Sequence, residues 1–195
     1  MIPILEFFNE LEDAIDQIDW RHVQAMIDEL VAVRERGGRL FLIGLGGSAA
    51  NCSHAAADFR TLCAIEAYSF DNLANLTALA NDGEWRDVFV KWLEASHVTG
   101  EDLIYVMSVG GGTQEVSQGL VMAMNWARDG EVPVIGVAGR DGGALAIHAR
   151  ACVIVPEPAD RSLITPITES MQAVIWHLLV SHPSLKRAKT AWEDK

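Results

Sequence analysis

The stretch Leu40-Phe-Leu-Ile-Gly-Leu-Gly-Gly-Ser48 decides the fold. Its first four residues are apolar without interruption, which is typical of a strand buried on both faces of a parallel sheet. The glycines that follow allow a tight turn, and a helical pattern begins directly after them. The stretch therefore predicts a strand, a glycine turn and a helix, with the turn at the carboxyl end of the strand.

The same arrangement recurs along the chain. Apolar runs occur at residues 40–43, 65–70, 103–107, 132–137 and 152–155, and helical patterns of a dozen or more residues separate them. Parallel strands joined by right-handed crossovers place helices on both faces of one sheet. We therefore expect an α/β fold, a three-layer αβα sandwich around a five-stranded parallel sheet, with a ligand crevice at the carboxyl ends of the strands.

Two helices are predicted before the first strand, and one follows the last strand. The first helix covers residues 4–18. The second covers residues 19–38, where Asp19 can cap the start and Gly37-Gly38 ends the helix. The final helix covers residues 165–181. The second helix carries an apolar stripe of Val23, Met26, Ile27, Leu30 and Val31.

Chain length and charge limit the possible functions. The 195 residues suit a single domain, which we divide into oligomerisation helices at 1–38, an αβα core at 39–182 and a polar tail at 183–195. With 15 basic and 27 acidic residues, the net charge of −12 opposes non-specific binding to nucleic acids or anionic membranes. No uninterrupted apolar run reaches the roughly 18 residues of a membrane span, and no basic leader precedes the first helix. We expect a cytoplasmic protein without direct nucleic-acid or membrane partners.

Three strands end in glycine-rich turns, at residues 44–48, 108–113 and 139–143. Glycines let the backbone approach a ligand, and the free N–H groups of a following helix favour an anion. Ser48 and Thr113 can each cap a helix or bind a phosphate oxygen. Every parallel sheet also needs tight turns, but two turns that both end in a hydroxyl favour a phosphate compound.

The sequence offers weak support for a nucleotide. A Gly-Lys-Ser/Thr phosphate loop is absent from the chain. The pattern G-x-G-x-x-A fits Gly44, Gly46 and Ala49, but the acidic residue expected to end the second strand is poorly matched by Glu66 or Asp71. A dinucleotide-dependent oxidoreductase is therefore a minor alternative, and we expect no nucleotide cofactor.

Four segments in order resemble the sugar isomerase (SIS) domain family, and most closely its phosphoheptose isomerase subfamily. They are Gly-Leu-Gly-Gly-Ser-Ala-Ala-Asn-Cys-Ser-His at 44–54, Ala-Asn-Asp at 80–82, Ser-Val-Gly-Gly-Gly-Thr at 108–113 and Gly-Arg-Asp-Gly-Gly at 139–143. The resemblance covers essentially the whole chain. It implies a homotetramer with phosphosugar sites at subunit boundaries.

The resemblance also implies residue roles. Ser48, Ser108 and Thr113 match positions that hold the phosphate, and Asn51 and Asp82 match positions that line the sugar. As polar residues of a helix and a turn, Asn51 and Asp82 could equally be structural.

His54 and Asp58 lie one helical turn apart, so both face the same side of the first core helix. This spacing suits a divalent ion, an acid/base pair or a plain surface contact. An aldose–ketose isomerisation needs a base at one carbon and an acid at the carbonyl oxygen, and a metal can assist. The resemblance implies that His54 and Asp58 hold one divalent metal ion such as zinc, and that Asp58 replaces a longer catalytic glutamate.

Several positions depart from the family pattern. Thr168 stands where the family has glutamine, and Trp176 stands where it has the catalytic histidine. His177 is adjacent, but one residue rotates a side chain by about 100° around a helix. In the turns, Leu45 replaces an asparagine, and Val109-Gly110 replaces two hydroxyl residues.

The leading hypothesis is a phosphosugar isomerase that converts a ketose phosphate, such as sedoheptulose 7-phosphate, to a heptose 7-phosphate. Its expected catalytic residues are Asp58, His54 and His177, and Thr168 is expected to join the substrate contacts. The alternative, favoured by Trp176, is a non-catalytic phosphosugar-binding protein or a protein adaptor of the type that binds a replication initiator.

Overall fold

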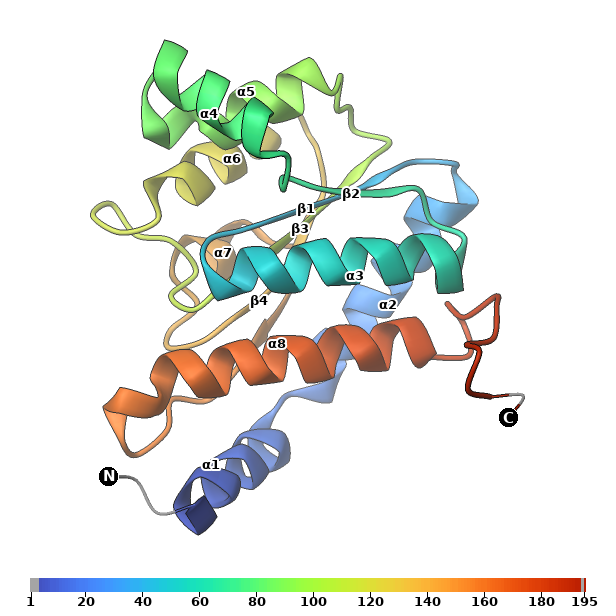
Figure 1. Cartoon of the computed structure of the whole chain (residues 1–195), viewed down its shortest axis with the longest axis vertical. Helices are drawn as coiled ribbons and strands as arrows, with labels where there is room; N and C mark the ends of the chain where they lie inside the picture. The colour runs from blue at the N-terminus through green and yellow to red at the C-terminus, as the bar shows by residue number, and fades with distance from the viewer. Residues whose placement is uncertain (1–3, 194) are drawn as a thin grey trace.

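The computed structural model describes residues 4–193 and residue 195, and it shows a parallel sheet between two layers of helices (Figure 1). The five strands lie in the order β2-β1-β3-β4-β5, and every neighbouring pair is parallel. The predicted fold class is therefore confirmed. The strands are β1 Leu40–Gly44, β2 Ala67–Ser69, β3 Leu103–Ser108, β4 Val134–Ala138 and β5 Ala151–Ile154.

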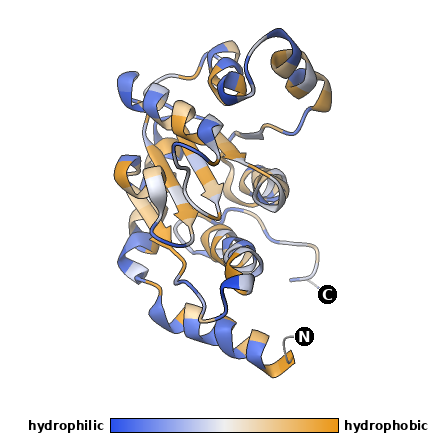
Figure 2. Ribbon diagram, turned by 90° about the vertical axis from the view of Figure 1, so that its left-hand side faces the viewer, coloured by the Kyte–Doolittle hydropathy of each residue, from blue (hydrophilic) through white to orange (hydrophobic). Residues whose placement is uncertain are grey.

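The helices divide between the two faces of the sheet. One face is covered by α2, α3 and α8, with α1 packed against α8, and the other by α4, α5, α6 and α7. Figure 2 shows the apolar strands enclosed between these layers. The helices are α1 Ile4–Gln17, α2 Trp20–Glu35, α3 Gly47–Cys63, α4 Leu73–Asp82, α5 Val88–Ala95, α6 Gln118–Asp129, α7 Gly143–His148 and α8 Ile164–Ser181, with short 3-10 turns η1 Trp85–Asp87 and η2 Arg161–Leu163.

Strand β1 shows why its apolar run is continuous. Leu40 and Leu42 pack into the core beneath α2, α3 and α8, whereas Phe41 and Ile43 pack into the core beneath α5 and α6. Successive side chains of a strand point to opposite faces, so a strand covered on both sides must be apolar throughout. The sheet therefore holds β1 rigidly and fixes the position of the glycine turn that follows it.

Two strand boundaries and one buried position of a helix differ from the prediction for local reasons. Strand β2 is an edge strand that pairs with only three residues of β1, so it is shorter than the apolar run. Strand β4 begins after Pro133, whose nitrogen has no hydrogen to donate to a ladder. In α2, Val33 is fully buried in the stripe where Val31 was expected, and Val31 is half-buried.

The final helix is apolar. By length and composition, the segment Arg161–Ser181 is the one candidate for a membrane span among the described residues. Half of its most apolar window is buried inside the fold, where α8 lies beside α3 (Figure 1). A core helix passes the same test, so the finding is weak evidence for a membrane span.

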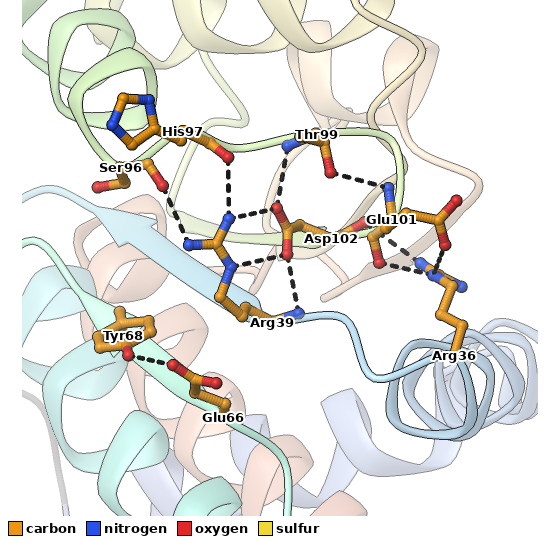
Figure 3. A network of polar contacts seen from close by, with 9 residues as sticks. All are labelled: Arg36, Arg39, Glu66, Tyr68, Ser96, His97, Thr99, Glu101 and Asp102. Atoms are coloured by element: carbon orange, nitrogen blue, oxygen red, sulfur yellow. Dashed lines mark hydrogen bonds and ion pairs between the residues drawn. The ribbon is translucent and has the colours of Figure 1, made fainter.

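An ion pair joins the amino ends of β1 and β3 (Figure 3). The Arg39 guanidinium donates to both carboxylate oxygens of Asp102, at 3.0 and 2.8 Å, and to the carbonyl oxygens of Ser96 and His97. Burial acts to raise the pKa of Asp102, but hydrogen bonds from Arg39 and from the backbone N–H of Thr99 outweigh burial and lower that pKa. The pair aligns the two strands whose opposite ends form the candidate site.

Candidate functional site

A cavity of about 670 Å³ opens at the carboxyl ends of the central strands. Strand order reverses between β1 and β3, and open parallel sheets bind ligands at such a switch point. All three glycine turns contribute to the wall, with Ser48 after β1, Ser108 and Thr113 after β3, and Arg140 after β4. The three residues expected to hold phosphate thus lie around one cavity.

The second and third glycine turns pack directly against each other. The N–H groups of Ala144 and Leu145 donate to the carbonyl oxygens of Gly112 and Gly111, at 2.9 and 3.0 Å. A Cβ atom on Gly111 would overlap the carbonyl oxygen of Gly142. The absence of side chains at these glycines therefore lets two backbone segments form one continuous wall.

The three hydroxyls occupy different surroundings. Ser48 lies in the first turn of α3, is buried, and has no hydrogen-bond partner for its Oγ in the described structure. The Ser108 Oγ accepts the N–H of Gly111 at 3.1 Å. Thr113 does not cap a helix, because α6 begins at Gln118 and its N-cap is Ser117.

Thr113 instead closes the turn that leads towards α6. Its Oγ1 accepts the backbone N–H groups of Glu115 and Val116, at 3.3 and 3.0 Å. These contacts hold the hydroxyl in place while leaving the residue exposed at the cavity wall.

A second group of polar side chains lies outside the cavity, where α3 and α8 run side by side. One potential ligand atom from each of His54, Asp58 and His177 lies within 4.8 Å of the other two. The His54 Nε2 is 4.0 Å from the Asp58 Oδ2. His177 therefore joins the pair despite the expected rotation, because His54 and His177 are both exposed at the rim of the α3–α8 interface.

The chemistry of these three residues fits a divalent cation. Two imidazoles and a carboxylate are common ligands for zinc and similar metals, with bonds of about 2.1 Å. The His177 Nδ1 lies 2.7 Å from the carbonyl oxygen of Ala173. Because a carbonyl can only accept, this contact requires a proton on Nδ1 and leaves Nε2 free to bind a metal.

Trp176 turns into the core beside this cluster. It is 1% exposed, its ring centroid lies 4.7 Å from that of His54, and its Nε1 has no partner among the described residues. The tryptophan therefore supports the imidazole of His54 by packing and offers no group for proton transfer.

Asn51 belongs to the contact between α3 and α8. Its Nδ2 donates to the carbonyl oxygen of Glu169 at 3.0 Å and to the Oε1 of Gln172 at 3.1 Å. The residue does not line the cavity. Gln172 is fully buried, and within the described chain its Nε2 lacks a partner.

Two other expected substrate contacts lie away from the cavity wall. Thr168 is buried against Gly139, where a Cβ atom would overlap the threonine hydroxyl. Asp82 is exposed at the end of α4 and accepts a hydrogen bond from Asn81 at 2.8 Å. Within one chain, neither residue lines the cavity with Ser48.

Sequence reasoning missed two charged residues near the site. The Glu169 carboxylate occupies the space that a side chain at Gly47 would need, at the amino end of α3, where the helix dipole favours a negative charge. Arg140 lines the cavity and is exposed. The only sequence signal for Arg140 was its place in the third glycine turn.

The cysteines do not extend the site. Cys52, Cys63 and Cys152 are buried free thiols. Burial raises the pKa of Cys63 to about 11 and that of Cys152 to about 12. Because the thiolate is the reactive form, these residues act as packing groups rather than nucleophiles.

Comparison with known proteins identifies relatives of the chain. Residues 6–139 match the family described as the SIS domain. Phosphoheptose isomerase from Roseiflexus is 33% identical over 161 residues, which span 76% of this chain and 79% of that protein. Phosphoheptose isomerase from Paramagnetospirillum magneticum is 34% identical over 166 residues, which span 82% of this chain and 79% of that protein.

A solved structure has the same fold. The phosphoheptose isomerase from Neisseria gonorrhoeae aligns with a TM-score of 0.75 and 23% sequence identity, over 90% of this chain and 91% of that one. The matched fold agrees with the similarity in sequence. The chain belongs to the SIS domain family, in its phosphoheptose isomerase-like branch.

Proposed function

We propose that this protein is a phosphosugar isomerase that interconverts a ketose phosphate, such as sedoheptulose 7-phosphate, and the corresponding heptose 7-phosphate. The observation that carries the proposal is that α3 connects two groups: Ser48 at its start lines the hydroxyl-bearing cavity, and His54 and Asp58 further along form a cluster with His177 of α8. Ser48 and His54 are six residues apart, about 9 Å along a helix axis. An extended phosphosugar can therefore have its phosphate at one group and its reacting carbons near the other.

The phosphate end of the substrate would occupy the cavity. Ser48, Ser108 and Thr113 supply hydroxyls, and the glycine turns supply close backbone approach. The unpartnered Oγ of Ser48 supports this role, because a buried hydroxyl without a partner is costly unless a ligand satisfies it.

The reacting end of the substrate would lie near His54, Asp58 and His177. Asp58 acts as the base that moves a proton between neighbouring carbons, and a histidine acts as the acid at the carbonyl oxygen. In the metal-assisted form of the reaction, His54 and Asp58 would hold zinc, with His177 as a third ligand, and the metal rather than a histidine would polarise that oxygen. Asp58 is half-buried and His54 is exposed, so both are accessible to a substrate and to solvent protons.

The remaining expected substrate contacts require side-chain movements or a second subunit. Asn51 and Thr168 would reach the sugar by exchanging their present packing contacts, and Asp82 would do so across a subunit boundary. We therefore include a homotetramer in the proposal, with the helices of residues 1–38 as the oligomerisation unit of a single SIS domain. A cytoplasmic location suits a phosphorylated sugar substrate.

The test is conversion of sedoheptulose 7-phosphate by the purified protein, with zinc content measured on the same samples. Asp58→Ala is expected to abolish product formation and to lower bound zinc, with the assembly intact. Asp129→Ala, an exposed position on α6, is the matched control and should retain activity. Unchanged turnover by Asp58→Ala would reject the role of this residue.

The alternative, a non-catalytic phosphosugar-binding or adaptor protein, is favoured by one observation. Trp176, which stands where the resemblance to the family places the catalytic histidine, is buried. Thermal stabilisation by sedoheptulose 7-phosphate without product would support this alternative, and clear turnover would eliminate it.

A further inference from the structure

We propose that Arg140 is the charged anchor for the phosphate of the substrate, a role that the hydroxyls of the cavity share but cannot supply alone. The inference rests on the proposed function only in taking the cavity to be the phosphate end of the site. It concerns the side chain of Arg140 in the third glycine turn, to which the isomerase proposal assigns no part.

The charges around the cavity favour this role. Arg140 is the one basic residue among the described residues that line the cavity, and Glu115 is the one acidic residue there. The chain as a whole carries a net charge of −12, so its overall field repels a phosphate dianion. A single nearby cation therefore has a large effect on phosphate affinity, because hydroxyls and backbone amides carry no net charge.

The donors of Arg140 are also available to a ligand. Throughout the part of the chain that the structure describes, the Arg140 guanidinium has no ion pair or hydrogen bond. By contrast, Arg39, Arg128 and Arg150 pair with neighbouring carboxylates. An unpaired guanidinium at a cavity wall keeps its donors free for an anion, and its planar fork matches two oxygens of a phosphate.

The third glycine turn places Arg140 beside the second. The turn that carries Arg140 is tied to the Ser108 turn by the N–H of Gly139, which donates to the carbonyl oxygen of Val109 at 3.0 Å. The Arg140 Nη1 lies 4.0 Å from the position that a Cβ atom on Gly110 would take. The guanidinium therefore lies over the turn that carries Ser108, on the cavity side.

The two residues that follow Ser108 have no side-chain group that could bind a phosphate. Val109 and Gly110 line the cavity, but neither has a side-chain hydrogen-bond donor. The end of the arginine side chain lies near the space above Gly110. Arg140 thus brings a charged donor to a part of the cavity wall where the local side chains offer none.

The backbone presents the side chain in a defined direction. Arg140 has φ +56°, a left-handed conformation that is uncommon for residues other than glycine. The N–H of Gly142 donates to the carbonyl oxygen of Gly139 at 3.0 Å, and the Asp141 carboxylate accepts the N–H of Gly143 at 3.1 Å. These hydrogen bonds close the turn around Arg140 and therefore restrict the direction in which its side chain leaves the backbone.

The experiment compares ligand binding by isothermal titration calorimetry for wild type, Arg140→Gly, Arg140→Ala and Arg140→Lys. The probes are sedoheptulose 7-phosphate, inorganic phosphate and unphosphorylated sedoheptulose. Arg140→Gly suits the left-handed backbone, so it removes the guanidinium without adding strain. Arg128→Ala on α6 is the matched control, because it makes the same change in net charge at an exposed position away from the cavity.

We expect Arg140→Gly and Arg140→Ala to bind both phosphate probes about tenfold to hundredfold more weakly, the range for lost hydrogen bonds to a charged group. Arg140→Lys should recover part of the affinity, because it keeps the charge but loses the fork. Binding of sedoheptulose should stay unchanged in every variant. In turnover assays the loss should appear mainly in KM.

The outcomes separate this inference from the proposed function. Equal phosphate affinity in wild type and Arg140→Gly overturns the role of Arg140, whether or not the protein turns over sugar phosphates. Weakened binding of phosphate probes supports that role even if wild type forms no product, a result that would refute the isomerase proposal alone. Failure of wild type to bind either phosphate probe overturns the inference as well.

Discussion

Trp176 and His177 are adjacent on α8, but the first is a buried packing residue and the second is exposed in the His–Asp–His cluster. Trp176 is buried in the core and its ring lies near that of His54, whereas His177 is exposed beside it. The Nδ1 of His177 contacts a carbonyl oxygen of its own helix. Trp176 thus packs against the imidazole of His54, and a backbone carbonyl orients the imidazole of His177. Both histidines lie close to the carboxylate of Asp58.

The pair between Arg39 and Asp102 predicts a pH-dependent stability (Figure 3). Asp102 is 3% exposed, and its lowered pKa means that folding favours the charged carboxylate. Its stabilisation is present above the unfolded carboxyl pKa of about 3.9 and is lost as pH falls through the lower folded pKa. Asp102→Asn should lower the free energy of unfolding at pH 7 by about 2 kcal/mol, because it removes the buried charge of the pair and weakens its hydrogen bonds to Arg39, whose side chain is half-buried.

Urea titrations at pH 7 and pH 3 measure this effect. The gap in unfolding free energy between wild type and Asp102→Asn should narrow at pH 3, because the carboxyl group of the unfolded wild-type chain, with a pKa of about 3.9, binds a proton there. Asp129→Asn, which changes an exposed pair with Arg128, should alter stability little at either pH. A gap that stays constant between the two pH values would contradict the assignment.

At the scale of elements, two glycines with left-handed backbones differ in what surrounds them. Gly111 has φ +68° and packs against the backbone of the next turn, whereas Gly37 has φ +72° and no atom within 4 Å of the position that a Cβ atom would take. Both conformations favour glycine, but only Gly111 also lacks space. The second and third turns therefore depend on each other, and the position of Arg140 depends on both.

Gly111→Ala and Gly37→Ala form a matched pair of variants. Gly37→Ala should cost about 1 kcal/mol in unfolding free energy, the penalty for a left-handed alanine. Gly111→Ala should cost about 3 kcal/mol, because the overlap with Gly142 adds to that penalty. It should also weaken binding of inorganic phosphate, whereas Gly37→Ala should not. Chemical denaturation and calorimetry measure the two effects, and equal costs would show that the turns do not pack as described.

The elements were more predictable from sequence than the contacts between them. The apolar run at residues 40–43 predicts a doubly covered strand because burial on both faces forces an apolar composition. The contact of Asn51 with Gln172 was not predictable, because it depends on the relative position of α3 and α8. For the same reason, the sequence indicated Arg140 as a turn residue but not as part of the cavity wall.

At the scale of the whole molecule, net charge bears on the phosphate site, and exposed apolar surface bears on assembly. The net charge of −12 opposes an anion, so the proposed phosphate site would depend on short-range donors, namely the hydroxyls, the backbone N–H groups and the one arginine that line the cavity. The exposed apolar residues of α1 do not belong to the cavity, and they do not pack on the core of their own chain. Ile4, Leu5 and Phe8 are 77%, 74% and 60% exposed, although α1 packs on the core through Phe7, Leu11 and Ala14.

The outer face of α1 therefore gives the last prediction, which concerns the proposed homotetramer. A helix with apolar side chains on both its inner and outer faces is favoured when a second protein surface covers the outer one. Phe8→Glu should place a charge in that contact and shift the sedimenting species from four times the 21.3-kDa chain mass towards smaller species. Glu12→Ala, an exposed polar position on the same helix, should leave the assembly unchanged. A Phe8→Glu variant that sediments like wild type would exclude this face as the subunit contact. A wild-type monomer would exclude the homotetramer itself, and Asp82 would then have no neighbouring site to reach.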